Sequence, residues 1–297
     1  MKIDQSKCNC YENMILYVGD FFKKDVNLYF LNTFGFAYVT DGIQIDQHCV
    51  LNKSSISFSN ELLWEYCGIR TAVIENNENN PTRDPIQCME GKNRIIGLRL
   101  NEEDEDNFVI YLGECDGVYK YQNLYRNREI NVIPARNFDT QVIQYFVFED
   151  YGVGFEPKGL DDVVLFLRTY INCSKDEYLK ALNRFARDID LFAFSSDVTV
   201  SHLIRSKFIF GLSNVSWSRY NFACALDHAK NLYQTHVFDQ VISKLLQCHK
   251  CWELVKNYVV KSFFIKEKLL YRKKIADLLL LIIEMESDMT HDLISLH

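Results

Sequence analysis

The sequence predicts an α+β fold in which the first half mixes strands with helices and the second half is helical. Short β-branched or aromatic runs, separated by acidic or Gly, Asn and Asp breaks, fill residues 93–150 and indicate neighbouring strands. After Gly159 the apolar residues recur instead at helical spacing. With 297 residues the chain is long enough for two domains, which we place at 1–160 and 161–297.

The N-terminal elements follow from apolar spacing. Residues 11–23 place Met14, Ile15 and Val18 on one face and predict a helix. Further along we expect a short helix and a strand within 26–40, a polar loop at 41–56, a helix at 61–66, a strand at 71–75 and a loop at 76–85. Gly68 suits the C-cap of the helix that precedes it.

Five strands and six helices follow. The strands are expected at 95–100, 108–112, 117–121, 130–134 and 142–149, with an acidic turn at 101–106. The helices are expected at 160–170, 175–188, 201–210, 220–233, 237–246 and 251–285. Ser174 and Glu177 fit a capping box at the start of the second helix.

Charge and cysteine content narrow the protein class. The net charge of -7 argues against a nucleic-acid partner, and the longest apolar run, within 275–283, is too short for a membrane span. The N-terminus has no apolar run typical of a signal peptide. The ten dispersed cysteines are therefore expected to be reduced thiols in the cytoplasm. A basic cluster within 266–274 is interpreted first as a solvated helix face and second as a partner-docking or nucleic-acid surface.

The segment Gln5-Ser-Lys-Cys-Asn-Cys10 leads directly into the first predicted helix. A thiol at a helix N-terminus meets the positive end of the helix dipole, which favours the nucleophilic thiolate. Backbone N–H groups there, together with the Gln5 side chain, could stabilise an oxyanion. The alternative is that the two cysteines are small buried residues, and the choice between Cys8 and Cys10 as nucleophile stays open.

The order of these motifs resembles the N-terminal domain of the butirosin biosynthesis protein H family. The resemblance rests on Cys10-Tyr-Glu-Asn with its helix, on Phe34-Gly-Phe36-x-Tyr38, on Cys67-Gly-Ile69, and on Asn137-Phe-Asp139 followed by a strand that ends in Glu149-Asp150. It implies a papain-like cysteine-peptidase fold for residues 1–160 and an added helical part. It further implies acyl transfer or amide formation in antibiotic or nonribosomal-peptide biosynthesis.

The sequence departs from this family in its histidines. A papain-like order places a His after the Cys and shortly before the Asp, but residues 50–200 contain none. His48 is then the candidate base, and the resemblance implies that Asp150 orients it. The alternative is a non-catalytic homologue that acts as a binding or scaffold protein in the same kind of pathway.

The pair Cys248-His-Lys-Cys251 could hold a metal or undergo redox chemistry. No second ligand pair with zinc spacing follows it, so we expect both thiols to pack in a helical core and expect no metal or cofactor.

The resulting hypothesis is an enzyme in which Cys10 is acylated by a carrier-bound thioester and an amine or water then attacks. Its expected partner is an acyl- or peptidyl-carrier protein, or the phosphopantetheine-bound substrate of one, without nucleic acid or membrane. A homodimer is also compatible with the sequence.

Overall fold

A computed structural model describes residues 1–40, 49–52, 57–76, 93–102, 105–124, 129–152, 155, 158–189, 203, 206–264 and 268–296. The chain divides into two compact units. The helical unit comprises Met1–Lys7, Phe30–Ile56 and Lys158–His297, and the sheet unit comprises Cys8–Tyr29 and Ser57–Pro157. The last change of unit, at 157–158, lies close to the predicted boundary at 160, whereas two N-terminal segments group with the helical unit.

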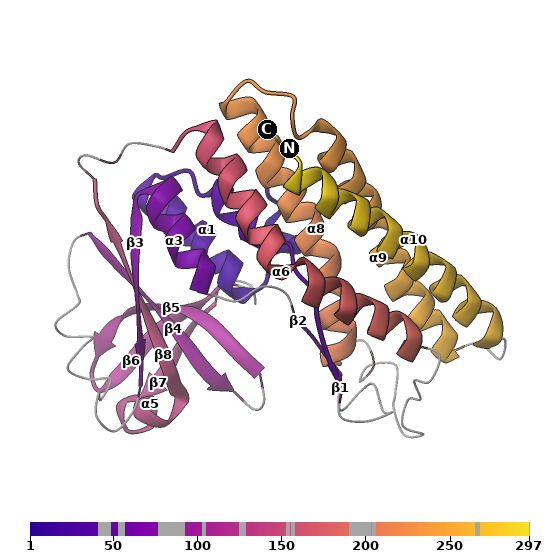
Figure 1. The fold of residues 1–297 in the computed structure, drawn as a ribbon. Helices are drawn as coiled ribbons and strands as arrows, with labels where there is room; N and C mark the ends of the chain where they lie inside the picture. Colours follow the sequence, from indigo (N-terminus) through magenta and orange to yellow (C-terminus); the bar gives the residue numbers. More distant parts are fainter. Residues whose placement is uncertain are drawn as a thin grey trace. The chain divides into compact units, whose positions relative to one another are not determined.

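The sheet unit is built on a six-stranded antiparallel sheet with the order β3-β8-β4-β5-β6-β7 (Figure 1). The strands are β3 (Ile69–Glu75), β4 (Arg94–Glu102), β5 (Glu105–Cys115), β6 (Val118–Asn123), β7 (Ile130–Pro134) and β8 (Val142–Asp150). All five predicted strands after residue 93 are confirmed, and the acidic turn lies where β4 pairs with β5.

Helices cover both faces of this sheet. On one face α1 (Cys10–Phe22) packs on β5 and α3 (Ser57–Cys67) packs on β3. The Tyr11 ring lies 5.1 Å from the Phe108 ring, and a Cβ at Gly97 would collide with Sδ of Met14. On the other face Phe138 of α5 (Ala135–Gln141) stacks on Tyr119 at 4.0 Å. Apolar side chains on both faces of the sheet therefore pack against helices.

Local sequence sets the ends of α1 and α3. Asn9 caps α1, because its side chain accepts from Glu12 N while the Glu12 carboxylate accepts from Asn9 N. Gly68 ends α3 with φ +66°, a conformation that glycine adopts without strain, and its N–H donates to Trp64 O at 3.2 Å. Both helix predictions are confirmed.

The helical unit contains α6 (Leu160–Asp188), α8 (Lys207–Leu232), α9 (Asp239–Phe264) and α10 (Lys268–Ile294). Neighbouring helices pack as α8–α9, α9–α10 and α10–α6, while the two-stranded ribbon of β1 (Ala37–Thr40) and β2 (Cys49–Asn52) contacts α6 and α8. Short 3-10 turns, η1 (Gln5–Lys7) and η2 (Asn27–Asn32), complete the described elements. No helix among the described residues is both long and apolar enough to cross a bilayer.

Four predicted details were wrong. The break between residues 210 and 220 is absent, because α8 runs without interruption from Lys207 to Leu232. The break before Ser174 is absent, since α6 continues through it and the Ser174 hydroxyl donates to Tyr170 O at 2.9 Å. The break between residues 246 and 251 is also absent, because α9 runs to Phe264 and the next helix starts at Lys268. Within the predicted loop at 41–56, residues 49–52 form β2, and residues 41–48 and 53–56 lie outside the described part.

Candidate functional site

Cys10 is the first residue of α1 and is only partly buried. The N-terminal end of a helix carries a partial positive charge, which favours a thiolate. The buried Glu12 carboxylate in the same turn opposes this effect, because it brings negative charge close to the thiol. Cys8, by contrast, is fully buried, so Cys10 is the accessible member of the pair.

An amide lies beside the Cys10 thiol. The Cys10 thiol donates to Oδ1 of Asn107, near the start of β5, at a sulfur–oxygen distance of 4.0 Å. Asn107 is only 6% exposed. The start of α1 thus combines a partly exposed thiol with a buried amide.

A guanidinium lies in the same region. Arg99 on β4 pairs in register with Phe108, and its Cζ is 6.0 Å from the Phe108 ring. Phe108 also contacts Tyr11, the residue after Cys10. Arg99 Nη1 donates to Gln144 Oε1 at 3.0 Å. We call these residues, Cys10, Tyr11, Arg99, Asn107 and Phe108, the Cys10 corner.

The buried thiols elsewhere are poor nucleophiles. Burial raises the pKa of Cys67 to about 12, that of Cys248 to about 12 and that of Cys224 to about 11. They therefore stay protonated at neutral pH. Among the described cysteines, only Cys115 and Cys173 are more exposed than Cys10. These two provide internal references for any thiol chemistry at Cys10.

Asp150 does not lie beside Cys10, which corrects the role implied for it. Leu100 pairs with both Asn107 and Val142, and Asp150 is eight residues beyond Val142 on β8. At about 3.3 Å per residue this separates the two ends by roughly 26 Å. Asp150 instead pairs with Lys24 at 3.2 Å and accepts from Gly152 N at 2.9 Å.

The other two predicted site residues stay predictions. Gln5 is an exposed residue of η1 and belongs to the helical unit. His48 lies outside the described residues. All seven histidines of the chain belong to segments of the helical unit, so the sheet unit that carries Cys10 contains no imidazole.

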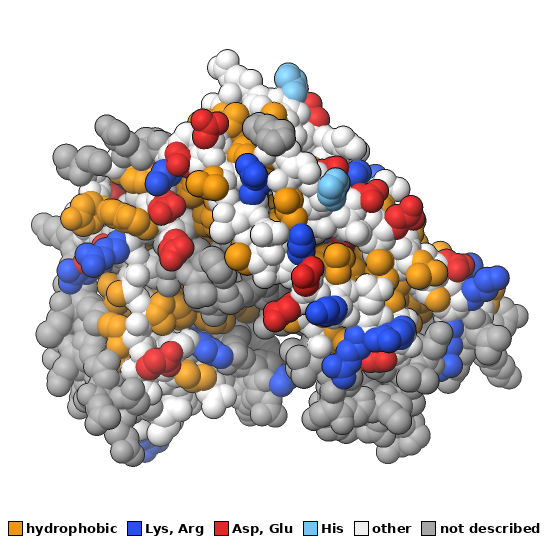
Figure 2. All heavy atoms as spheres, in the orientation of Figure 1, with side chains coloured by type: hydrophobic (Ala, Val, Ile, Leu, Met, Phe, Trp, Pro, Cys, Tyr) orange, Lys and Arg blue, Asp and Glu red, His pale blue; other side chains and the backbone are white. Residues whose placement is uncertain are grey.

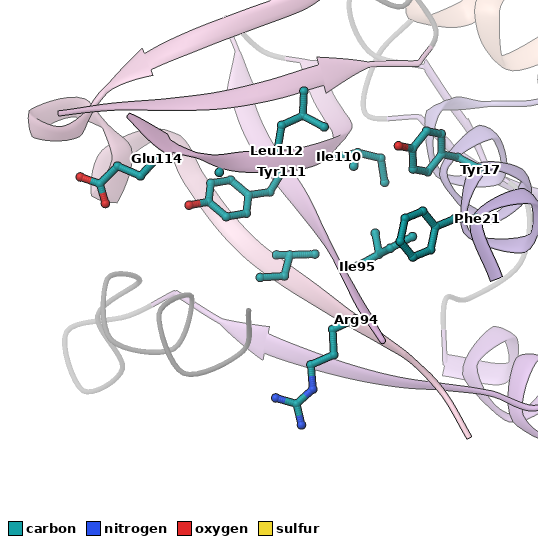
Figure 3. A pocket seen from close by; sticks show the side chains of 10 residues that line it. Tyr17, Phe21, Arg94, Ile95, Ile110, Tyr111, Leu112 and Glu114 are labelled. Atoms are coloured by element: carbon teal, nitrogen blue, oxygen red, sulfur yellow. The ribbon is translucent and has the colours of Figure 1, made fainter. Parts of the chain in front are cut away.

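A groove of about 390 Å³ lies at the opposite end of α1 (Figure 3). Tyr17 and Phe21 of α1 face Ile95 of β4 and Ile110 of β5 across it, and Arg94 and Glu114 lie at its rim. Tyr17 is seven residues from Cys10, which is roughly 10 Å along the helix. The groove is thus separate from the Cys10 corner.

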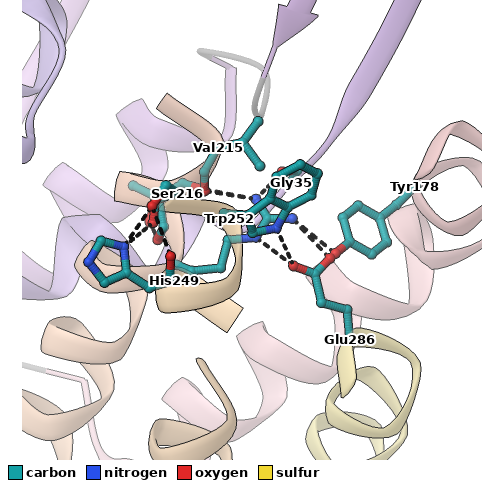
Figure 4. A network of polar contacts seen from close by, with 10 residues as sticks. Gly35, Tyr178, Val215, Ser216, His249, Trp252 and Glu286 are labelled. Carbon is teal, nitrogen blue, oxygen red and sulfur yellow. Dashed lines mark hydrogen bonds and ion pairs between the residues drawn. The ribbon is translucent and has the colours of Figure 1, made fainter. Parts of the chain in front are cut away.

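The helical unit has its own buried polar centre, which we call the Arg219 centre (Figure 4). Arg219 and Glu286 are both 0% exposed, and Arg219 Nε and Nη2 donate to the two Glu286 oxygens at 2.8 and 3.1 Å. Trp252 Nε1 donates to Glu286 at 3.2 Å, and Arg219 Nη1 donates to Gly35 O at 2.7 Å. Burial lowers the pKa of Arg219 to about 10 and raises that of Glu286, so desolvation opposes the ion pair that these donors stabilise.

Ser216 and His249 make a second polar contact at the α8–α9 interface. The Ser216 hydroxyl lies 2.8 Å from His249 Nδ1 and 3.2 Å from His249 O. Burial lowers the pKa of His249, which keeps the imidazole neutral at neutral pH. Ser216 is 0% exposed, so the pair resembles a catalytic dyad in composition but is closed to a substrate.

The Cys248–Cys251 pair lies on α9, where both side chains are buried, as predicted. The raised pKa values of both thiols, caused by burial, disfavour metal and redox chemistry there. Within the described residues, no group of three or more His, Cys, Asp or Glu side chains has a geometry that could hold a metal ion.

Sequence reasoning missed Asn107 and Arg99. Both residues lie in segments whose alternating polar and apolar residues are typical of an ordinary strand. Only the pairing register of β4 with β5 brings them near the start of α1. A search of the sequence for a catalytic histidine would not identify either residue. A scan of the chain against protein-family models gives no match, and a search of curated proteins finds no relative.

Proposed function

We propose that the sheet unit is a papain-like domain in which Cys10 accepts an acyl group from a thioester. The observation that carries the proposal is the partly exposed thiol at the start of α1 beside the buried Asn107 amide. Helix N–H groups at this position support charge on the thiolate and, during attack, on the carbonyl oxygen. The resemblance to the butirosin biosynthesis protein H family supports the same assignment.

The surroundings of Cys10 favour a thioester donor over an amide. An amide releases an amine, which needs a general acid, and the sheet unit has no histidine to supply a proton. A thioester releases a thiolate, whose conjugate acid has a pKa of about 8.5, so it departs without prior protonation. Exchange between a thiol and a thioester therefore needs no general acid from the protein.

The proposed reaction has two steps. The Cys10 thiolate attacks the thioester carbonyl, a new carbon–sulfur bond forms and the donor thiolate leaves. An amine then attacks the acyl-Cys10 thioester, forms an amide and returns the proton to the cysteine sulfur, whereas water would give an acid. A carrier-bound intermediate in antibiotic or nonribosomal-peptide biosynthesis is the donor that the resemblance suggests.

Acylation of the full-length protein with S-acetyl-N-acetylcysteamine tests this proposal. Peptide mass spectrometry should locate the acetyl group on Cys10 much faster than on Cys115 or Cys173. Cys10→Ala should remove the adduct, and Cys115→Ala, the matched control, should keep it. Equal labelling of the three thiols, or an adduct rate unchanged by Cys10→Ala, would count against acyl transfer.

A second candidate is a non-catalytic binding or scaffold protein on the same fold. The specific observation that favours it is the lack of any histidine in the sheet unit that carries Cys10. This candidate predicts that Cys10 reacts no faster than the exposed reference thiols, so the same experiment decides between the two.

A further inference from the structure

The hairpin of α9 and α10 concentrates positive charge in an acidic chain. Residues 254–276 contain seven Lys or Arg side chains and one acidic side chain, Glu267, a net charge of +6. The whole chain carries -7, so the remainder carries -13. Such segregation gives one end of the hairpin a local field of opposite sign to the rest of the protein.

Two of these lysines lie beside two aromatic rings. Tyr258 of α9 and Tyr271 of α10 lie 5.6 Å apart. Lys274 Nζ is 5.5 Å from the first ring and 5.6 Å from the second, and Lys261 Nζ is 6.0 Å from the first. Lys261, Lys273 and Lys274 are exposed, and none of them forms an ion pair with another described residue. In Figure 2 a few basic side chains are visible at this end of the hairpin, and a larger basic group lies over α6.

Exposed leucines continue the same surface. Leu254, Tyr258 and Lys261 follow one another at helical spacing on α9, as do Tyr271, Lys274 and Leu281 on α10. Leu254 is 42% exposed and Leu281 is 39% exposed. The contact between Lys274 and Tyr258 shows that these two faces meet at one seam. The seam is cationic near the turn of the hairpin, and farther along it exposed Leu254 and Leu281 accompany one carboxylate, that of the exposed Asp277.

We propose that this seam docks an amphipathic acidic helix of a partner protein. Leucines would contact its apolar face, and Lys261, Lys273 and Lys274 would pair with its carboxylates. Such pairing chiefly accelerates encounter and fixes orientation, and it weakens with salt. The surface lies wholly in the helical unit, so the proposal does not depend on the chemistry of Cys10.

The charge balance favours a protein partner over nucleic acid. A polynucleotide extends beyond a short patch, and the net charge of -13 on the remaining residues would repel it. Six of the seven cations are lysines, whereas bidentate recognition of phosphate favours arginine. A short acidic helix engages the local cations alone.

Fluorescence anisotropy with the full-length protein tests the proposal. The probe is a labelled helical peptide with leucine on one face and glutamate on the other, and its comparison is a scrambled peptide of the same composition. We expect the amphipathic peptide to bind roughly tenfold more tightly than the scrambled one at low salt, and less tightly as salt rises. Lys261→Glu/Lys274→Glu should weaken binding by about tenfold or more.

The matched control is Lys180→Glu/Arg187→Glu, which makes the same charge change at exposed residues of α6. It should leave the affinity within about twofold, since these residues lie outside the seam. Three results would overturn the proposal: equal loss in both double variants, equal binding of the scrambled peptide, or tighter binding of a single-stranded oligonucleotide than of the peptide. Self-association that Lys261→Glu/Lys274→Glu abolishes would instead assign the seam to a second copy of the chain.

Discussion

The Arg219 centre and the Cys10 corner are both polar groups placed in apolar surroundings, but they differ in how accessible they are to solvent. Arg219 and Glu286 are inaccessible, and each makes several hydrogen bonds between 2.7 and 3.4 Å. Cys10 is partly exposed, and its sulfur lies 4.0 Å from Asn107 Oδ1. A closed network of hydrogen bonds stabilises one packing arrangement, whereas an accessible thiol keeps the capacity to react.

The largest effect is expected when the Arg219 centre loses one charge. Arg219→Met should lower the free energy of unfolding by about 3–5 kcal/mol, because it leaves the Glu286 carboxylate buried without its cation. Arg219→Met/Glu286→Leu should cost less than the single change, since no charge is then buried. Urea unfolding measures both, and a single variant within about 1 kcal/mol of the parent would contradict a structural role.

A smaller loss is expected where α1 rests on the sheet. Gly97→Ala adds a methyl group that collides with Met14, and it should cost about 1–3 kcal/mol. Met14→Ala in the same protein should relieve part of the collision while it opens a cavity of its own. Gly159→Ser, at the N-cap of α6 where serine is favourable and the added Cβ meets only Asp162 at 3.8 Å, serves as the control and should not lower stability. Equal losses of unfolding free energy in the two glycine variants would show that α1 does not pack tightly on the sheet.

The Cys10 corner should respond through reactivity instead of stability. Asn107→Asp places a carboxylate beside the thiol and should raise the pKa of Cys10, so iodoacetamide alkylation at pH 7 should slow by about tenfold. Asn107→Leu removes the amide without adding a charge, so it separates the effect of losing the hydrogen-bond partner from the effect of the added carboxylate. Alkylation rates of Cys115 and Cys173 in the same samples provide the reference. A pH profile of Cys10 that is identical in all three proteins would exclude Asn107 from any role in positioning the thiol.

The smallest effect concerns His249 in the helical unit. Burial lowers the pKa of its imidazole below the ordinary value of 6.5, so the unfolded chain binds a proton more readily than the folded one. The contribution of His249 to stability is therefore complete above about pH 6.5 and is lost as the pH falls through the lowered folded pKa. Ser216, Tyr220, Glu253, Lys7 and Lys256 surround it.

Thermal unfolding between pH 8 and pH 5 measures this dependence. The melting temperature of the parent should fall on acidification, and that of His249→Asn should fall less. A parallel decline in both proteins would assign the acid sensitivity to other groups.

Local patterns predicted the elements well and the polar centres poorly. Helix α1 and the strands β4 to β8 follow from spacing and from breaks in the chain, which depend on neighbouring residues. The single helix α6 was predicted as two, because Ser174 and Glu177 imitate a capping box although the Ser174 hydroxyl bonds back to the preceding turn. Arg219, Glu286 and Asn107 are each a lone polar residue in sequence, and only tertiary packing decides that they are buried.

The interleaved order of the two units has a consequence for how the protein is made. The chain changes unit after Lys7, Tyr29, Ile56 and Pro157, so the β1–β2 ribbon leaves the ribosome well before α8, the helix that β2 contacts. Its contacts therefore span a long sequence separation, which slows folding because a large loop must close first. The helical unit should complete only late in synthesis, and a fragment ending at residue 157 would carry an N-terminal ribbon without its helices.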